Sequence, residues 1–361
     1  MTNIIKTMAI TAALTFFATS AVNASVKSDT ATPKITEEGF LYEKADFPSC
    51  HASTVLETRK GSTLVAYFGG EYEGADDVKI WISRREKGQK VWKMSMAADG
   101  FGTACYNPVL TELPDGRIVL FYKIGKNVQA WTGWYKTSTD DGHTWSEPVA
   151  LPNGFLGPIK DKPVVTDGRL LCPSSKEKDY WRVHFETWDL TTGQWHYYGP
   201  LTAENATTTM DRPKEVLQPI VCIQPTVIHL PDGTLQALCR TKNGFLATTY
   251  SADNGLTWTP IVATDLPNNN SGVDAVTMSD GRHALVYNDL VTPDGGDMGP
   301  RNSLALAIFS PDMSRMEQKI SLENTKEGEY SYPAIIETKD GHLFITYTWH
   351  RQRIAYKVVE P

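Results

Sequence analysis

The chain has 361 residues and a formal net charge of −7. This mild acidity, without any run of Lys or Arg, makes nucleic acids and anionic membranes unexpected partners. The sequence carries no cofactor motif and no His/Cys set with metal-ligand spacing, so we expect neither a cofactor nor a metal.

The first 24 residues read as a secretory signal peptide. Lys6 supplies a positive charge, residues 8–18 are apolar, and residues 22–24 form a small-residue cleavage site. The apolar stretch is too short to span a bilayer. We therefore expect export to the periplasm or the cell exterior, a linker over residues 25–37 and one domain over residues 38–361, with no membrane association.

The rest of the sequence consists of short runs rich in β-branched and aromatic residues, with almost no helical periodicity. This pattern predicts an all-β sandwich, barrel or propeller, and an internal repeat decides among them. Six hairpins share an apolar strand, a turn ending in Gly and a second apolar strand, at spacings typical of propeller blades. We therefore predict a six-bladed β-propeller. The six glycines are Gly61, Gly116, Gly168, Gly233, Gly281 and Gly341.

A second repeat supports this fold. Residues 138–145 and 251–258 are two copies of the pattern S-x-D-x-G-x-T-W, and weaker copies occur elsewhere. The sixth repeat ends after three strands, the third of them over residues 354–359. Residues 39–43 can supply its fourth strand from the other end of the chain, which would remove an exposed sheet edge.

Aligning the hairpins on their glycines identifies the residues that should face the propeller axis. Most of these positions are polar or charged, where a purely structural core would carry Val, Leu or Ala. Because buried polar groups must be paired or solvated, we expect a wet, polar pocket at one end of the axis. The positions before the glycine are Ala52, Asn107, Lys162, Gln224, Asp274 and Tyr332, and those seven residues after it are Phe68, Lys123, Ser175, Arg240, Asn288 and Thr348.

The S-x-D-x-G-x-T-W pattern resembles the Asp box of sialidases. The segment Cys50-His51-Ala52-Ser53-Thr54 resembles a bacterial branch of sialidase-like BNR-repeat proteins. The resemblance covers nearly the whole chain after the signal peptide and implies the sialidase fold. It also implies a site in which three arginines hold a substrate carboxylate, a Tyr helped by a Glu is the nucleophile, and an Asp is the acid/base.

Several residues match this implied site. Arg240 and Arg301 match the second and third arginines, and Tyr332 matches the nucleophile. Asp77, with Asp76 as its rival, stands in the loop where the acid/base Asp belongs. Further substrate-binding candidates are Asn107, Lys123, Lys162, Asp274 and Arg182.

Three departures indicate a remodelled site. His51 replaces the first arginine, and Thr348 replaces the Glu that would steady it. Gln224 replaces the Glu beside Tyr332, and a neutral amide cannot take the proton of a phenol, which is a weak nucleophile until a base activates it. His51 could be the titrating group instead, because its ordinary pKa lies near working pH.

Two further sets of residues keep two interpretations each. Arg182, His184 and Glu186 alternate, so they share one strand face and could line the site or form a solvated ladder. Arg351 and Arg353 have the same two interpretations.

Five cysteines are present, an odd number for an exported chain. Cys50, Cys105 and Cys222 occupy one register, eleven residues before their glycines. This recurrence predicts small buried thiols rather than a disulfide framework.

Three functions follow from these observations. The first is a sialidase-like, exo-acting glycoside hydrolase on a sugar that carries a carboxylate, with Asp77 as acid and Tyr332 or a water as nucleophile. The second is a lyase or dehydratase acting on a uronate, with His51 or Tyr332 removing a proton. The third is a non-catalytic propeller that binds glycans. In all three the expected partner is a glycan, most naturally an acidic one.

Overall fold

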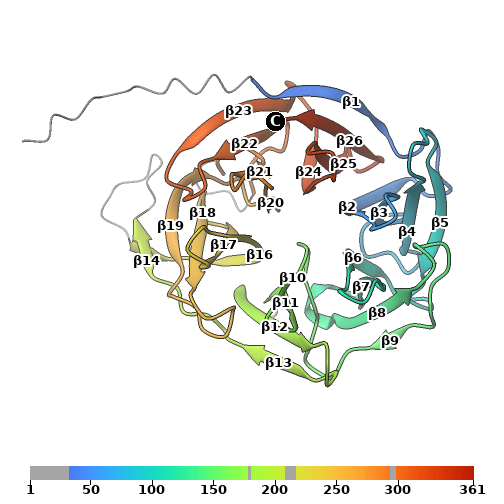
Figure 1. The fold of residues 1–361 in the computed structure, drawn as a ribbon, viewed down its shortest axis with the longest axis horizontal. Coiled ribbons are helices and arrows are strands. Elements are labelled where there is room, and N and C mark those ends of the chain that lie inside the picture. The colour runs from blue at the N-terminus through green and yellow to red at the C-terminus, as the bar shows by residue number, and fades with distance from the viewer. Residues whose placement is uncertain (1–31, 178–179, 208–216, 293–297) are drawn as a thin grey trace, which may run out of the picture. The chain divides into compact units, whose positions relative to one another are not determined.

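The computed structural model describes residues 32–361 except 178–179, 208–216 and 293–297, all within the unit Thr32–Pro361. In this described part, six four-stranded antiparallel sheets surround a central axis (Figure 1). The predicted six-bladed β-propeller is confirmed. No helix in the described residues is long and apolar enough to cross a membrane. The predicted signal peptide lies outside the described residues.

Each blade is a meander of consecutive strands, and the bounds of the strands are as follows. Blade 1 contains β2 (Ser49–Glu57), β3 (Thr63–Gly70), β4 (Lys79–Arg85) and β5 (Lys93–Ala98). Blade 2 contains β6 (Cys105–Glu112), β7 (Ile118–Ile124), β8 (Thr132–Ser138) and β9 (Val149–Ala150), with the 3-10 helix η1 (Val128–Ala130). Blade 3 contains β10 (Val164–Thr166), β11 (Arg169–Lys176), β12 (Arg182–Asp189) and β13 (Trp195–Tyr198).

The second half of the ring repeats this arrangement. Blade 4 contains β16 (Cys222–His229), β17 (Leu235–Thr241), β18 (Phe245–Ser251) and β19 (Val262–Pro267), preceded by the hairpin β14 (Asn205–Thr207) and β15 (Leu217–Pro219). Blade 5 contains β20 (Asp274–Thr277), β21 (His283–Tyr287), β22 (Ser303–Phe309) and β23 (Met316–Asn324). Blade 6 contains β24 (Tyr330–Glu337), β25 (Leu343–Trp349), β26 (Arg353–Glu360) and β1 (Lys34–Phe40).

The six predicted turn glycines all lie between the first and second strands of a blade. Their φ angles fall between +72° and +88°, a left-handed conformation that glycine adopts readily because it has no Cβ. The repeated Gly is therefore the residue that allows each hairpin to turn tightly.

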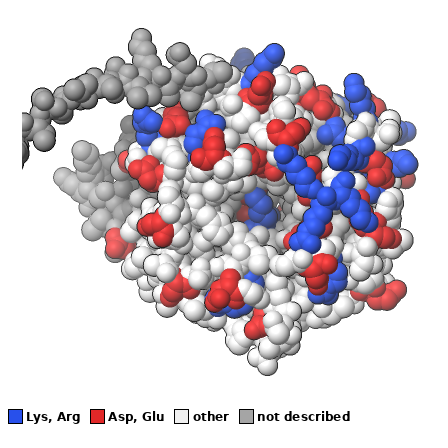
Figure 2. Space-filling view, in the orientation of Figure 1, with Lys and Arg blue, Asp and Glu red and all other residues white. Residues whose placement is uncertain are grey.

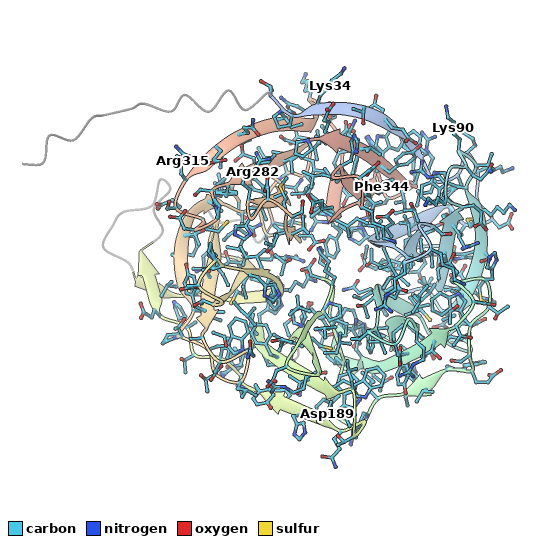
Figure 3. The ribbon with its side chains drawn as sticks, viewed as in Figure 1. Lys34, Lys90, Asp189, Arg282, Arg315 and Phe344 are labelled. Carbon is cyan, nitrogen blue, oxygen red and sulfur yellow. The ribbon has the colours of Figure 1, made fainter. Side chains whose placement is uncertain are left out.

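Apolar side chains fill the spaces between neighbouring blades. Six clusters of buried residues occur in the described chain, and each joins two adjacent sheets. Phe344 packs in the cluster between blades 6 and 1, whereas Lys34, Asp189 and Arg315 lie on the outer rim (Figure 3). In the view down the axis, the centre of the ring is hollowed, and Lys and Arg atoms are visible in the hollow (Figure 2). The core is thus a ring of interfaces around a polar axis.

The ring is closed by the two ends of the propeller. Strand β1 pairs antiparallel with β26, from Lys34 opposite Glu360 to Phe40 opposite Ala355. The predicted closure is present, but its N-terminal strand is β1 rather than residues 39–43, so residues 34–37 belong to blade 6 and not to a linker. The strand was difficult to recognise because it lies at the outer edge, where most of its side chains are exposed and polar.

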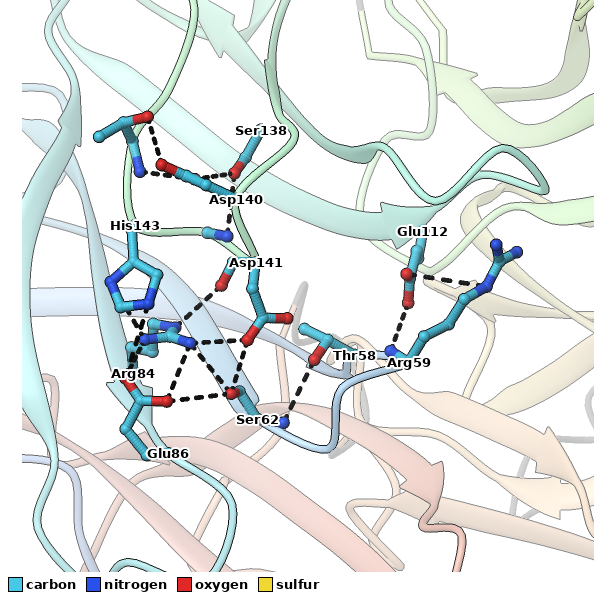
Figure 4. Close-up of polar contacts among 12 residues, drawn as sticks. Thr58, Arg59, Ser62, Arg84, Glu86, Glu112, Ser138, Asp140, Asp141 and His143 are labelled. Atoms are coloured by element: carbon cyan, nitrogen blue, oxygen red, sulfur yellow. Dashed lines mark hydrogen bonds and ion pairs between the residues drawn. The ribbon is translucent and has the colours of Figure 1, made fainter.

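The S-x-D-x-G-x-T-W pattern folds the turn between the third and fourth strands. In the copy of blade 2, Asp140 Oδ1 accepts bonds from Ser138 Oγ at 2.8 Å and from the backbone N–H of Thr144 at 2.9 Å. Asp141 reaches the neighbouring blade, where its Oδ2 lies 2.7 Å from both Arg84 Nη2 and Ser62 Oγ (Figure 4). The motif therefore shapes its own turn and also ties blade 2 to blade 1.

Replacing Asp140 by Asn should lower the melting temperature in a pH-dependent way. Bonds donated by Thr144 hold the pKa of Asp140 well below its ordinary value. A carboxylate with a depressed pKa stabilises the fold above its unfolded-state pKa of about 3.9, and this stabilisation is lost as pH falls through the folded-state pKa. We expect a clear loss in Tm for Asp140→Asn at pH 7 that shrinks below about pH 4. The control is Asp46→Asn, at an exposed position. If Asp140→Asn lost as much Tm below about pH 4 as at pH 7, the assignment would be contradicted.

All five cysteines are buried free thiols, as predicted. Cys50, Cys105 and Cys222 lie at the beginning of β2, β6 and β16. Burial raises the pKa of Cys50 and of Cys105 to about 12. These thiols therefore stay protonated and behave as small apolar side chains.

Candidate active site

The first strands of four blades contain a bulge at the same place. The bulged residue adopts a left-handed backbone conformation that is costly for any residue other than Gly, and the bulge redirects its side chain. In three of the four blades the next residue is Pro, which has no N–H to leave unsatisfied at the bulge. The four residues are Ala52, Asn107, Gln224 and Tyr332, with φ of 57°, 34°, 53° and 50°.

Blades 4 and 6 bring three of the predicted site residues into direct contact. The phenol oxygen of Tyr332 accepts a bond from Arg240 Nη1 at 2.6 Å and one from Gln224 Nε2 at 3.2 Å. Arg240 Nη1 also donates to Gln224 Oε1 at 3.1 Å, which fixes the orientation of the amide. Because both bonds at the phenol oxygen are accepted, the hydroxyl proton of Tyr332 is available to a ligand.

Two further arginines, Arg301 and Arg351, belong to the surroundings of Tyr332. The guanidinium carbon of Arg301 is 5.6 Å from the centre of the Tyr332 ring, the same distance as that of Arg240. Arg301 and Arg351 share Glu329, whose Oε1 is 3.3 Å from Arg301 Nη1 and 3.2 Å from Arg351 Nε. We call these three residues, Arg240, Arg301 and Arg351, the arginine centre.

Arg351 is the arginine that sequence analysis left undecided. It does not occupy the position of the missing first arginine, which is His51, but comes from the turn after β25, where its φ is 59°. Its Nη1 lies 2.6 Å from Glu73 Oε2 in the β3–β4 loop. The third guanidinium is therefore supplied from a different strand and held by a carboxylate of blade 1.

His51 is a neutral packing group and not the titrating residue that the sequence suggested. Its ring centre lies 4.1 Å from that of Tyr332, and its Nδ1 is 2.8 Å from Thr348 Oγ1. Burial, followed by the charges of the arginines around it, lowers the pKa of His51 well below 6.5. The imidazole therefore remains uncharged at neutral pH. His51 and Thr348, the two positions at which the resemblance implies an Arg–Glu pair, are hydrogen-bond partners of each other.

The centre has a surplus of positive charge at Arg240. This side chain is 5% exposed, and its guanidinium is held by neutral groups: Asn270 Oδ1 at 2.8 Å, Gln224 Oε1 and the phenol of Tyr332. The Nε of Arg301 is buried and has no hydrogen-bond partner among the described residues. A buried cation whose hydrogen-bond partners are all neutral is costly, so this centre is suited to an anion.

Lys123, Lys162 and Asp274 do not belong to a substrate-binding surface. Lys123 is fully buried and donates to the carbonyl oxygens of Asn107, at 3.2 Å, and of Pro158. Burial lowers the pKa of Lys123 to about 7. Lys162 Nζ lies 2.7 Å from Asp274 Oδ2 in an ion pair. Lys123 is thus satisfied by backbone carbonyl groups, and Lys162 and Asp274 satisfy each other.

Asp274 and Asn107 link blades. Asp274 also accepts bonds from Thr226 Oγ1 and the N–H of Ile335, both at 2.9 Å. Asn107 is 4% exposed, and its carbonyl holds Lys123. Both predicted binding residues therefore serve the packing of the axis.

The face shared by Arg182, His184 and Glu186 is neither part of the arginine centre nor a solvated ladder. Arg182 is exposed, with its guanidinium 5.7 Å from the ring of Tyr180. His184 and Glu186 are fully buried and joined at 2.9 Å. The neighbouring Trp181 lies against Arg240 instead, 5.1 Å from its guanidinium carbon.

Asp77, the expected acid, and a second carboxylate, Glu177, have different surroundings. Asp77 is exposed, and both of its oxygens lie 3.1 Å from the backbone N–H of Glu71, so it holds the turn of its own loop. Glu177, which follows β11, is half-buried and interacts electrostatically with Arg240, and burial raises its pKa. Sequence analysis missed Glu177, although it lies only two residues beyond the axial position Ser175. In the described chain, no group of three or more His, Cys, Asp or Glu residues is placed to hold a metal.

Comparisons with known proteins agree with this architecture. The model of the BNR repeat-like domain family matches residues 61–345. A search of curated proteins finds no match. Among solved structures, a protein of unknown function from Dyadobacter fermentans has a TM-score of 0.68 at 16% identity, covering 91% of this chain and 99% of that one.

Sialidases are also among the similar solved structures. The NanB sialidase of Streptococcus pneumoniae has a TM-score of 0.64 at 13% identity, covering 89% of this chain and 70% of that one. The intramolecular trans-sialidase of Ruminococcus gnavus has a TM-score of 0.65 at 15% identity, covering 89% of this chain and 96% of that one. At these identities the likeness establishes the fold.

Proposed function

The chain belongs to the BNR repeat-like domain family, and from this premise we propose that it is an exo-acting glycoside hydrolase for a terminal sugar that carries a carboxylate. The observation that carries the proposal is the buried guanidinium of Arg240, whose hydrogen-bond partners in the described chain are all neutral. A ligand carboxylate would supply the missing negative charge through charge-assisted bonds. The signal-peptide pattern supports export as a further part of this proposal.

Arg301 and Arg351 complete the proposed carboxylate site. Both are held by Glu329, and the Nε of Arg301 has no hydrogen-bond partner among the described residues. Arg301 is 7% exposed, so its interaction with an anion would be little weakened by water. A planar guanidinium group can donate two parallel hydrogen bonds to the two oxygens of a carboxylate. Such bonds fix the orientation of the bound carboxylate and also increase its affinity.

In the proposed reaction the bound carboxylate places the anomeric carbon of the sugar over Tyr332. The attacking oxygen is that of Tyr332 or of a water molecule beside it. Arg240 Nη1, 2.6 Å from the phenol oxygen, stabilises negative charge that develops there. Gln224 orients Tyr332 but cannot accept its proton.

Gln224 also favours a second candidate, a propeller that binds acidic glycans without cleaving them. An amide in place of a base leaves affinity for the anion intact and removes the usual activation of Tyr332. The lyase is the weaker alternative, because the best candidate base, His51, is 2% exposed and has a depressed pKa. A low pKa makes the imidazole a poor acceptor for a carbon-bound proton.

The test is hydrolysis of a panel of acidic glycans by purified protein without its predicted signal peptide. The panel holds sialyllactose, glucuronides and uronate-rich polysaccharides, with products identified by mass spectrometry and ultraviolet absorbance. We expect a free acidic monosaccharide from the wild type and from Arg315→Met, an exposed arginine on the rim, and at least a hundredfold less from Tyr332→Phe. An unsaturated product would establish the lyase. Saturable binding without any product would establish the non-catalytic propeller.

A further inference from the structure

A cavity lies between blades 2 and 3, and its lining includes Glu177, whose charge interacts with Arg240. Its volume is about 220 Å³, and its lining combines Trp131, Phe155 and Leu156 with the charged residues Lys176 and Glu177. A sugar ring fits such a lining, because its C–H face packs on aromatic side chains and its hydroxyl groups can bond to the charged side chains of Lys176 and Glu177.

The wall of this cavity is held rigidly by buried groups. The backbone N–H groups of Leu156 and Gly157 donate to the carboxylate of Glu186, at 3.1 and 2.7 Å. Glu186 is fully buried and bonded to His184 Nε2 at 2.9 Å, and the ring of His184 stacks on Tyr197 at 4.5 Å. A loop fixed in this way presents a preformed surface to a ligand.

Glu177 connects this cavity with the arginine centre. It lines the cavity, and its charge is attracted by Arg240 and repelled by Glu73, the partner of Arg351. The carboxyl group therefore lies at the boundary between the proposed carboxylate site and the cavity. A glycosidic oxygen joining a sugar in each would lie at the same boundary.

Asp77, at the position of the sialidase acid, is used differently in this chain. Both of its oxygens receive the N–H of Glu71, and the side chain is exposed. Glu177 is the more enclosed of the two, and burial raises its pKa. A carboxyl group that keeps its proton longer as pH rises is the better proton donor near neutral pH.

Building on the proposed function, we infer that Glu177 protonates the leaving oxygen and that the cavity beside it receives the sugar on the leaving-group side. The anomeric C–O bond breaks with its electron pair going to the glycosidic oxygen, which takes the proton of Glu177. Over the full cycle, water supplies a hydroxyl group to the anomeric carbon, and its other proton restores the acid. Net consumption is one water for each bond cleaved.

The test compares two leaving groups in Glu177→Gln and Asp77→Asn. The probes are sialyllactose and methylumbelliferyl sialoside, or the matching glucuronides if the wild type cleaves those. The aryl leaving group departs as a stable phenolate and needs no acid. The sugar leaving group would depart as an unstable alkoxide, so it must be protonated. We therefore expect Glu177→Gln to lose at least about a hundredfold in kcat on the disaccharide and only a few-fold on the aryl glycoside. The fall of wild-type activity at high pH, where Glu177 loses its proton, should disappear in this variant.

The cavity is tested separately with Trp131→Ala. This variant should raise the KM for the disaccharide about tenfold, while inhibition by the free acidic monosaccharide, which needs the arginines alone, stays unchanged. If Glu177→Gln loses both substrates equally, or if Asp77→Asn shows the dependence on leaving group instead, the inference is wrong and the hydrolase proposal stands. If the wild type cleaves neither probe, both are overturned.

Discussion

Arg240→Met is expected to lower kcat/KM for the acidic substrate by about two orders of magnitude or more. The change removes the bond to the phenol of Tyr332 and, of the three guanidinium groups, the one whose described hydrogen-bond partners are all neutral. A charge-assisted hydrogen bond contributes about 1.5–3 kcal/mol, and about 2.7 kcal/mol corresponds to a hundredfold. The measurement is kcat/KM on the substrate identified by the panel, together with the Kd of the free acidic sugar by calorimetry.

Arg315→Met is the matched control for this change. Arg315 is on the outer rim (Figure 3), and its side chain is 70% exposed in a surface ion pair with Glu317, so its loss should leave both constants unchanged. Gln224→Glu is a probe of opposite sign: a carboxylate beside Arg240 would supply the missing charge and weaken binding of the free acid. Unchanged affinity for the acid in both Arg240→Met and Gln224→Glu would show that the anion does not bind there.

Glu186→Ala is expected to be the most destabilising single change in the molecule that we can identify. It leaves His184 and the N–H groups of Leu156 and Gly157 without their acceptor in a fully buried position. Removal of one partner from such a network costs about 3–5 kcal/mol. The free energy of unfolding, measured by urea denaturation with two probes, should fall by this amount.

Glu147→Ala serves as the control for the Glu186 prediction. Glu147 lies in the turn between β8 and β9 and is exposed, so its loss should change the free energy of unfolding by less than about 0.5 kcal/mol. A loss below about 1 kcal/mol for Glu186→Ala would mean that water or a shifted side chain replaces the carboxylate, and that the cavity wall is not held as described.

Most of the fold was predictable because its repeats depend on backbone geometry. Each blade needs a residue with positive φ at its first turn, and glycine marks that position in all six. Counting from the glycine then identified the bulged residues, because the bulges recur at the same distance along the strand. Gln224, Tyr332 and Arg240 meet in the structure for this reason.

The site residues that the sequence did not predict correctly lie where the register of the strands gives no information about what a side chain contacts. Lys123 points towards the axis as expected, but the sequence does not reveal how deep along the axis it lies, and it is fully buried. Arg351 and Glu177 lie beyond the ends of strands, where the path of the loop decides what the side chain can reach. Arg351 reaches Glu73 from a turn in which Arg351 itself has a positive φ. Because this residue is not a glycine, the sequence does not indicate such a turn.

The way the ring closes also has a consequence for the order in which the molecule can form. Thr36 bonds to Val358 and Lys357 to Glu38, across 322 and 319 positions of the chain. During synthesis, β1 leaves the ribosome first and must wait without a partner until the last strand has been made. An unpaired apolar strand would be prone to aggregate during that time. The exposed Lys, Thr and Glu side chains of β1 are of the kind that disfavours pairing between sheet edges of different chains, so we expect them to oppose such aggregation.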